Sequence, residues 1–286
     1  MAAERYRPQL TNAARPAIFE VEATNERGEM VPTSIAGEHP LTIYLDKREI
    51  VTLMTLGHAP EALVLGYLRN QRLVDSVDAI AAVQVDWDTD SAAVTTRKRS
   101  TRGLKQKMAR RTVTSGCGQG TMFGNLMEEI ERVKLRQDVR LADAQLFDLI
   151  EKVRHHETIY KQSGAVHGCA LARGCGPALA EILMFIEDVG RHNAVDAIAG
   201  RMWLDAIDGS DKVFYTTGRL TSEMVIKCAQ MEIPFLVSRS GLTHMGYEIA
   251  QRVGLTMLGR ASGRHYLAFT GGHRLERTLP QPSALA

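Results

Sequence analysis

A cysteine surrounded by glycines is the strongest candidate for chemistry in this sequence. Cys117 lies in the segment TSGCGQG, with glycines directly before and after it and again at Gly120. Glycines leave the sulfur uncovered and allow the backbone to adopt positive φ. The thiolate is the nucleophilic form of cysteine, and nearby cations lower the thiol pKa. Residues 97–111 carry eight Lys and Arg and no acidic residue, and could supply such cations. These features fit a reactive thiol and a cysteine in an ordinary Gly-rich turn equally well, so both interpretations stay open at this point.

The other three cysteines have weaker signatures. Cys169 falls in an apolar strand pattern and Cys228 in a helical one, so both are predicted to be buried and inert. Cys175 lies in a predicted turn without an activating neighbour. The set His167, Cys169 and Cys175 matches no zinc-binding spacing, so no metal site is predicted.

Three polar segments stand where a strand pattern gives way to a helix pattern. They are residues 187–196, 216–223 and 238–244. Each contains an arginine, which offers bidentate donors to phosphate, and each precedes a helix whose amides favour anions. Together they predict a phosphate-binding rim on one side of a sheet. For the first segment the alternative is structural, with Asn193 capping the helix and Asp188 pairing with Arg191 at the surface.

The elements that must position these residues alternate in type. The patterns predict a hairpin over 41–54, a helix over 59–68, a strand over 79–85, a helical block over 122–153, paired strands over 164–172 and 180–185, a helix over 193–203, a strand over 212–216, a helix over 222–231, a strand over 235–238, a helix over 247–253 and two short final strands. Such alternation indicates an α/β fold in which helices cover a mixed or parallel sheet.

Composition narrows the functional classes. The chain has 286 residues, 44% of them hydrophobic, which is enough for a substantial core. A net charge of +2 provides no global basic field for nucleic acid. The N-terminus has no apolar signal region and no stretch is long enough to span a membrane, so a cytoplasmic protein is expected. Residues 1–35 are polar and proline-containing, and are predicted to form a mobile leader.

Several motifs resemble, in order, those of the formate dehydrogenase accessory sulfurtransferase family (FdhD). They are GEHPLTIYLD with TLGHAPEALVLGYL, TSGCGQG, EDVGRHNAVDAI, YTTGRLTSEMVIKCA and IPFLVSRSG, within residues 34–275. The resemblance implies a cytidine-deaminase-like α/β core, a mixed sheet covered by helices with a smaller N-terminal α/β portion, and a homodimer. The expected division is a leader over 1–35, an N-terminal subdomain over 36–115, a Cys loop and helical connector over 116–155, and the cytidine-deaminase-like domain over 156–280.

The resemblance also implies a reaction. In the family, a cysteine desulfurase loads sulfur onto the loop cysteine, which makes Cys117 the persulfide carrier. The sulfur then passes to the molybdenum bis(molybdopterin guanine dinucleotide) cofactor, a bound client destined for the catalytic subunit of formate dehydrogenase. The family's cofactor-binding segment corresponds to Arg260, Ala261, Ser262, Gly263, Arg264 and His265.

One departure from the family pattern keeps an alternative open. Family members commonly carry C-x-x-C in the loop, whereas Gly120 occupies the second position here. A dithiol relay within the loop is therefore excluded, and a non-catalytic cofactor-binding assembly chaperone is the second interpretation. Nucleic-acid binding through residues 97–111 is disfavoured because no aromatic residues are interleaved. Deamination is disfavoured because the H-x-E and P-C-x-x-C signature is absent.

Overall fold

The computed structural model describes residues 6–97, 112–113, 120–121, 130, 133–156, 158–174 and 179–277. The chain forms two compact units from interleaved segments. Unit 1 comprises residues 1–129, 157–169 and 186–207, and unit 2 comprises 130–156, 170–185 and 208–286. The sequence predicted contiguous segments instead. Sequence patterns report local structure, and they do not reveal that residues 186–207 cluster with the N-terminal half.

Unit 1 is built on a five-stranded sheet of order β1-β6-β7-β4-β5. Its strands are β1 (Gln9–Leu10), β4 (His39–Leu45), β5 (Arg48–Thr55), β6 (Ile80–Asp86) and β7 (Ser91–Thr96). The antiparallel pair β4–β5 confirms the predicted hairpin. Alternate residues of β4, namely Leu41, Ile43 and Leu45, are buried in the core of the unit. Short elements complete the unit: η1 (Val77–Ala79), α5 (Ile159–Ser163), and the two-residue strands β8 (Thr112–Val113) and β9 (Gly120–Thr121).

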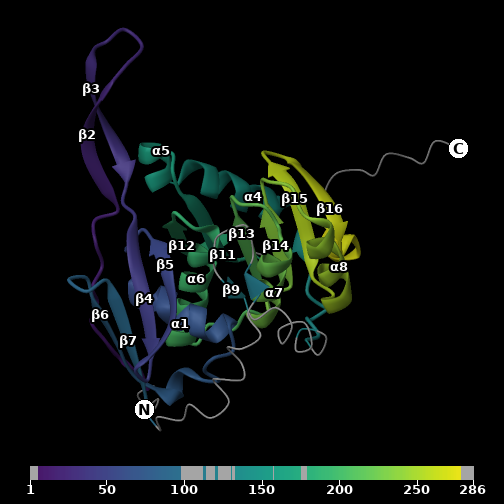
Figure 1. The fold of residues 1–286 in the computed structure, drawn as a ribbon. Helices are drawn as coiled ribbons and strands as arrows, with labels where there is room; N and C mark the ends of the chain where they lie inside the picture. Colours follow the sequence, from purple (N-terminus) through teal and green to yellow (C-terminus); the bar gives the residue numbers. More distant parts are fainter. Residues whose placement is uncertain are drawn as a thin grey trace, which may run out of the picture. The chain divides into compact units, whose positions relative to one another are not determined.

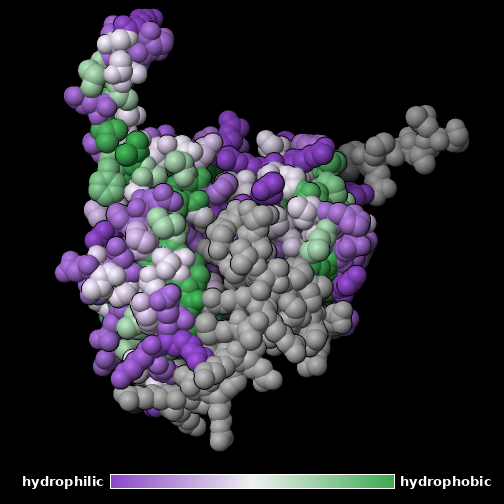
Figure 2. All heavy atoms as spheres, viewed as in Figure 1, coloured by the Kyte–Doolittle hydropathy of each residue, from purple (hydrophilic) through white to green (hydrophobic). Residues whose placement is uncertain are grey.

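The expectation of a mobile leader is wrong for the described residues. Strands β2 (Ile18–Thr24) and β3 (Met30–Ala36) form an antiparallel hairpin that extends beyond the five-stranded sheet (Figure 1). One face of it is apolar, with Phe19 opposite Ile35 and Ala23 opposite Val31. Figure 2 shows apolar side chains on this hairpin, and Phe19 is 42% exposed. Glutamates alternate with apolar residues in β2, which is a strand pattern, but the polar composition and the prolines of residues 1–35 favoured a leader.

Two helices of unit 1 pack with their backbones in direct contact. They are α1 (Pro60–Asn70) and α6 (Arg191–Asp205), which lie side by side (Figure 1). A Cβ added at Gly66 would lie 1.6 Å from the Asp196 carbonyl oxygen, and one at Gly200 would lie 1.9 Å from the Ala62 carbonyl oxygen. Both positions therefore exclude any side chain. Next to this contact, the Asn70 amide donates to the Asp196 carboxylate at 2.7 Å.

Unit 2 contains most of a six-stranded sheet of order β12-β11-β13-β14-β15-β16, and the boundary between the units falls within β11 and β12. The strands are β11 (His167–Arg173), β12 (Glu181–Asp188), β13 (Lys212–Thr216), β14 (Phe235–Ser238), β15 (Thr256–Ser262) and β16 (His265–Thr270). Neighbours β13, β14 and β15 are parallel, and β16 returns antiparallel. The remaining elements are α4 (Asp143–His155), α7 (Ser222–Gln230), α8 (His244–Val253), η2 (Gly272–Arg274), and the paired strands β10 (Leu141–Ala142) and β17 (Leu275–Glu276).

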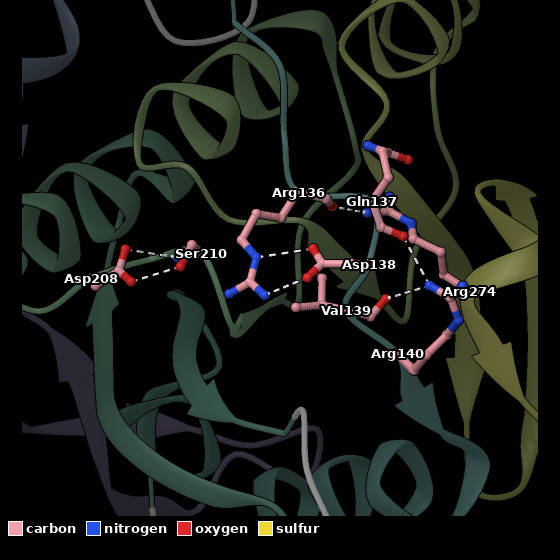
Figure 3. Close-up of polar contacts among 8 residues, drawn as sticks. All are labelled: Arg136, Gln137, Asp138, Val139, Arg140, Asp208, Ser210 and Arg274. Carbon is pink, nitrogen blue, oxygen red and sulfur yellow. Dashed lines mark hydrogen bonds and ion pairs between the residues drawn. The ribbon is translucent and has the colours of Figure 1, made fainter.

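A buried arginine joins separate segments of unit 2. Arg274 is 0% exposed, and its guanidinium donates to the carbonyl oxygens of Arg136 at 2.7 Å and Gly254 at 2.6 Å. It also lies over the Phe235 ring, with 5.1 Å between the guanidinium carbon and the ring centroid. Figure 3 shows this residue beside the 136–140 segment, where Arg136 and Asp138 form two hydrogen bonds of 3.0 and 2.6 Å. Peptide dipoles thus compensate the buried charge.

The fold is mixed α/β, with sheets and helices in the order that the sequence predicted. Helices α1, α6, α7 and α8 and strands β6, β13 and β14 match the predicted elements to within a few residues. Of the predicted helical block, α4 is described, whereas residues 122–129 lie outside the described residues. The likeness to cytidine deaminases stays a prediction. Among the described helices, none is both long and apolar enough to cross a bilayer.

We expect Gly200→Ala to lower the stability of the protein by about 1–3 kcal/mol or more, because overpacking forces backbone shifts. The new methyl group meets Ala62 backbone atoms that cannot rotate away. The intrinsic helix preference for alanine, about 1 kcal/mol, acts in the opposite direction and is outweighed. Denaturant unfolding followed by circular dichroism measures the change. Gly241→Ala is the matched control, since a Cβ there meets no atom within 4 Å. Equal stability of both variants would contradict the close contact.

Candidate functional site

The predicted nucleophile lies outside the described residues. Cys117 falls between strands β8 and β9, whose antiparallel ladder pairs Thr112 with Thr121 and Val113 with Gly120. Most of the basic run over 97–111 also lies outside them. The reactivity predicted for Cys117 therefore stays a prediction.

The structure brings two of the three predicted polar junctions together in unit 2. Residues 217–221 connect β13 to α7, and residues 239–243 connect β14 to α8. Because β13 and β14 are parallel, with Thr216 opposite Ser238, both connections emerge at the same edge of the sheet. The turn between β15 and β16, within the predicted segment 260–265, follows the next parallel strand at this edge. Ligands of open α/β sheets bind at the carboxyl ends of parallel strands.

Backbone and hydroxyl hydrogen bonds hold the three loops in register. The Leu220 amide donates to the Gly241 carbonyl at 2.9 Å, and the Thr243 amide donates to the Leu220 carbonyl at 3.1 Å. The Ser238 hydroxyl, which is fully buried, donates to the Gly218 carbonyl at 2.6 Å and accepts from the Ser240 amide at 2.9 Å. The loops therefore form one continuous surface. We call it the arginine rim: residues 217–221, 239–243 and 260–265.

The arginine rim is positively charged. Arg219, Arg239, Arg260 and Arg264 are all exposed, and each loop contributes at least one of them. The rim also contains the N-termini of α7 and α8, which attract anions. At the start of α7, the buried hydroxyl oxygen of Thr221 has no hydrogen-bond partner among the described residues. Exposed guanidinium groups beside helix starts can hold a phosphate or diphosphate group.

The backbone of the rim is irregular at one arginine. Arg260 has a φ of +53°, a left-handed conformation that costs a non-glycine residue roughly 1–2 kcal/mol. It lies where the β15–β16 ladder shifts register between Gly259 and Ser262. The amide of Arg260 is held by the Ser240 carbonyl at 3.0 Å. Backbone strain of this kind is often found at ligand-binding sites, where it orients a side chain.

Contacts with α4 support the β15–β16 hairpin, and the sequence did not reveal them. The Tyr266 hydroxyl donates to the Asp143 carboxylate at 2.7 Å. Desolvation and this hydrogen bond raise the pKa of Tyr266 to about 12, so it remains a donor at neutral pH. The guanidinium of Arg264 lies over the Phe147 ring, 5.6 Å from its centroid. Tyr266 directly follows the segment that the family resemblance indicated, but its partner is 123 residues away in sequence.

The first polar junction, residues 187–196, belongs to unit 1. Its Asp188 forms hydrogen bonds that hold the fold together. Asp188 is 6% exposed and accepts hydrogen bonds from the Thr55 hydroxyl at 2.6 Å and the Leu56 amide at 3.1 Å. It also accepts from the Gly190 amide at 3.0 Å and the Asn193 side chain at 2.8 Å. Burial raises the pKa of Asp188, and these four hydrogen bonds oppose the shift. The carboxylate thus joins the end of β5 to the start of α6.

The alternative interpretation of this junction is wrong in both details. Asn193 does not cap α6, because the cap position is Gly190 and the Asn193 amide donates to Met54 and Asp188 instead. Asp188 and Arg191 are both buried, so they form no surface pair. The predicted burial of Cys169 and Cys228 is confirmed, since both are 0% exposed, whereas Cys175 lies outside the described residues.

Comparisons with known proteins identify the family. The model of the FdhD/NarQ family matches residues 36–276. The sulfur carrier protein FdhD of Listeria innocua serovar 6a is 30% identical over 247 residues, which cover 86% of this chain and 92% of that protein. The protein of the same name from Sulfurisphaera tokodaii is 29% identical over 265 residues, covering 91% and 98%.

A solved structure has a similar fold. The crystal structure of a formate dehydrogenase accessory protein from Desulfotalea psychrophila superposes with a TM-score of 0.69 at 25% sequence identity. The match covers 91% of this chain and 98% of that one. The family model, the curated relatives and the structural neighbour agree over most of the chain, and the protein therefore belongs to the FdhD/NarQ family.

Proposed function

We propose that this protein carries sulfur as a persulfide on Cys117 and transfers it to the molybdenum bis(molybdopterin guanine dinucleotide) cofactor required by formate dehydrogenase. Relatives named as sulfur carrier proteins and a neighbour described as a formate dehydrogenase accessory protein support this role. The structural observation that carries the proposal is the arginine rim, where four exposed arginines meet two helix starts. A client with two diphosphate groups is an anion of the kind that such a surface attracts.

The loading of Cys117 needs one nucleophile and no external oxidant. The Cys117 thiolate attacks the outer sulfur of a persulfide on a cysteine desulfurase. A sulfur–sulfur bond forms at Cys117 while the donor's sulfur–sulfur bond breaks, and the donor cysteine leaves as a thiolate. Because Gly120 replaces the second loop cysteine, no neighbouring thiol within that loop can displace the sulfur as an internal disulfide.

The arginine rim would bind the phosphate groups of the cofactor, and it would not contact the molybdenum centre. Arg219 and Arg260 come from different loops, so one diphosphate could be contacted from two directions. The backbone bonds among the loops, such as that from Arg260 to Ser240, hold these positions before the client arrives. Prior ordering reduces the entropy lost on binding.

The partners and the homodimer are proposed from the family resemblance, and the compartment from the sequence. We expect a cysteine desulfurase as donor, the catalytic subunit of formate dehydrogenase as recipient, a cytoplasmic location and a homodimer. The second candidate function is a non-catalytic chaperone that binds the cofactor and delivers it without carrying sulfur. Gly120 in place of the second cysteine is the observation that favours it.

Intact-mass analysis separates the two functions. After incubation with a cysteine desulfurase and cysteine, we expect the protein to gain one reducible sulfur that peptide mapping assigns to Cys117. Cys117→Ser should abolish both the gain and the maturation of formate dehydrogenase. Cys228→Ser is a control at a fully buried thiol and should load normally. A protein that takes up no sulfur from an active donor, yet still matures the enzyme, would favour the chaperone.

The arginine rim is tested by the double variant Arg219→Gln/Arg239→Gln. Hydrogen bonds to charged groups contribute about 1.5–3 kcal/mol each, so the affinity for GDP, a probe of the cofactor's nucleotide end, should fall roughly tenfold or more per arginine. Isothermal titration calorimetry measures the affinity. Arg252→Gln, in the last turn of α8, is the control and should leave the affinity unchanged. An unaltered GDP affinity in the double variant would exclude the rim as the binding surface.

A further inference from the structure

A second buried arginine, in unit 1, has no visible counter-charge. Arg191 is the first residue of α6 and is 8% exposed. Its Nε atom is buried without a hydrogen-bond partner, and within the described residues its guanidinium forms no hydrogen bond or ion pair. Arg274 shows what a compensated buried arginine looks like, because its guanidinium donates to backbone carbonyls at 2.6 and 2.7 Å. Arg191 has no such carbonyls.

The nearest carboxylates in sequence are already occupied. Glu187 accepts hydrogen bonds from the amides of Ile159 at 2.7 Å and Tyr160 at 3.0 Å, and so serves the start of α5. Asp188 accepts four hydrogen bonds from β5, Gly190 and Asn193. The first turn of α6 contains no acidic residue. Among the described residues, neither Glu187 nor Asp188 forms an ion pair with Arg191.

The position of Arg191 adds a second attraction for anions. Side chains of an α-helix lean toward its N-terminus, so the guanidinium of the first residue lies near the unsatisfied amides there. The partial positive charge of a helix start, roughly half an elementary charge, adds to the full charge of the guanidinium. The buried Nε has no partner, and an anion bound at this helix start could accept hydrogen bonds from the guanidinium and from the helix amides together.

We propose that Arg191 and the N-terminus of α6 form an oxyanion site that takes a phosphate group. Phosphate suits the site because its oxygens can accept from the guanidinium fork and from helix amides together, and because it brings more negative charge than a carboxylate. The phosphate comes either from the free anion or from the diphosphate of a nucleotide. The proposed function assigns no role to Arg191 or to the start of α6, so this site goes beyond it.

Replacement of the arginine by an apolar residue of similar length tests the site. Thermal unfolding and equilibrium dialysis are measured for the full-length protein with inorganic phosphate and, separately, with GDP. We expect saturable phosphate binding and a rise in the melting temperature of the unmodified protein. Arg191→Met should unfold at the same or a higher temperature without phosphate, because it removes an uncompensated charge, and should lose the phosphate-dependent rise.

Two controls separate this site from other arginines. Arg201→Met, on the same helix but exposed and paired with Asp205, should keep the full response to phosphate. Arg219→Gln/Arg239→Gln removes phosphate binding at the rim, but it should keep the part of the response to phosphate that Arg191→Met abolishes, whatever happens to sulfur loading on Cys117. If GDP produces the Arg191-dependent rise in melting temperature at a lower concentration than phosphate does, the phosphate group comes from a nucleotide. If only inorganic phosphate produces that rise, the ligand is the free anion.

The proposal is overturned if Arg191→Met binds phosphate as the unmodified protein does, if the unmodified protein binds none, or if only the rim variant loses binding. If Arg191→Met unfolds at a lower temperature than the unmodified protein, the phosphate affinity of Arg191→Lys is measured instead. Lysine keeps the charge but not the bidentate fork, so phosphate affinity about tenfold weaker supports the site. An affinity for phosphate equal to that of the unmodified protein would show that Arg191 takes no part in binding.

Discussion

The backbone contact between α1 and α6 is the constraint on which unit 1 depends. Gly66 and Gly200 cost each helix about 1 kcal/mol in intrinsic stability, and both are retained because no side chain fits between the helices. Two polar contacts accompany the approach, one from Arg69 to the Ala199 carbonyl at 3.0 Å and one from Asn70 to Asp196. The contact fixes the position of α6 relative to α1, and the hydrogen bonds of Asp188 hold the first turn of α6 against the end of β5. The location of Arg191 follows from these two restraints.

Unit 2 meets a different constraint, since three successive loops must emerge at one sheet edge without leaving polar backbone groups unpaired. Much of the pairing is between the loops themselves, through Leu220, Gly241, Ser240 and Arg260. Backbone groups thus hold the loops, and the arginine side chains are not needed for that purpose.

Local features of the fold were predictable, and long-range ones were not. The β4–β5 hairpin and helices α1, α6, α7 and α8 follow from periodicity, which neighbouring residues determine. Two loops of the arginine rim were anticipated because each carries an arginine and precedes a helix, whereas the turn between β15 and β16 was indicated only by the family resemblance. The roles of Asp188 and Tyr266 were not predictable, because their partners lie 133 and 123 residues away. The β2–β3 hairpin was not predicted, although β2 has the alternation of a strand, because the polar composition and prolines of residues 1–35 favoured a leader.

The two buried arginines have opposite surroundings, and we assign them different roles. Arg274 is surrounded by fixed carbonyl oxygens of unit 2, so its charge is compensated permanently and it acts as a structural tie. Arg191 stands at a helix start, where the nearby backbone groups are amides and repel a cation rather than stabilise it. Glu187 and Asp188 could have served as internal counter-charges, but the fold uses both for other donors. An external oxyanion is the partner that satisfies the guanidinium and the amides together.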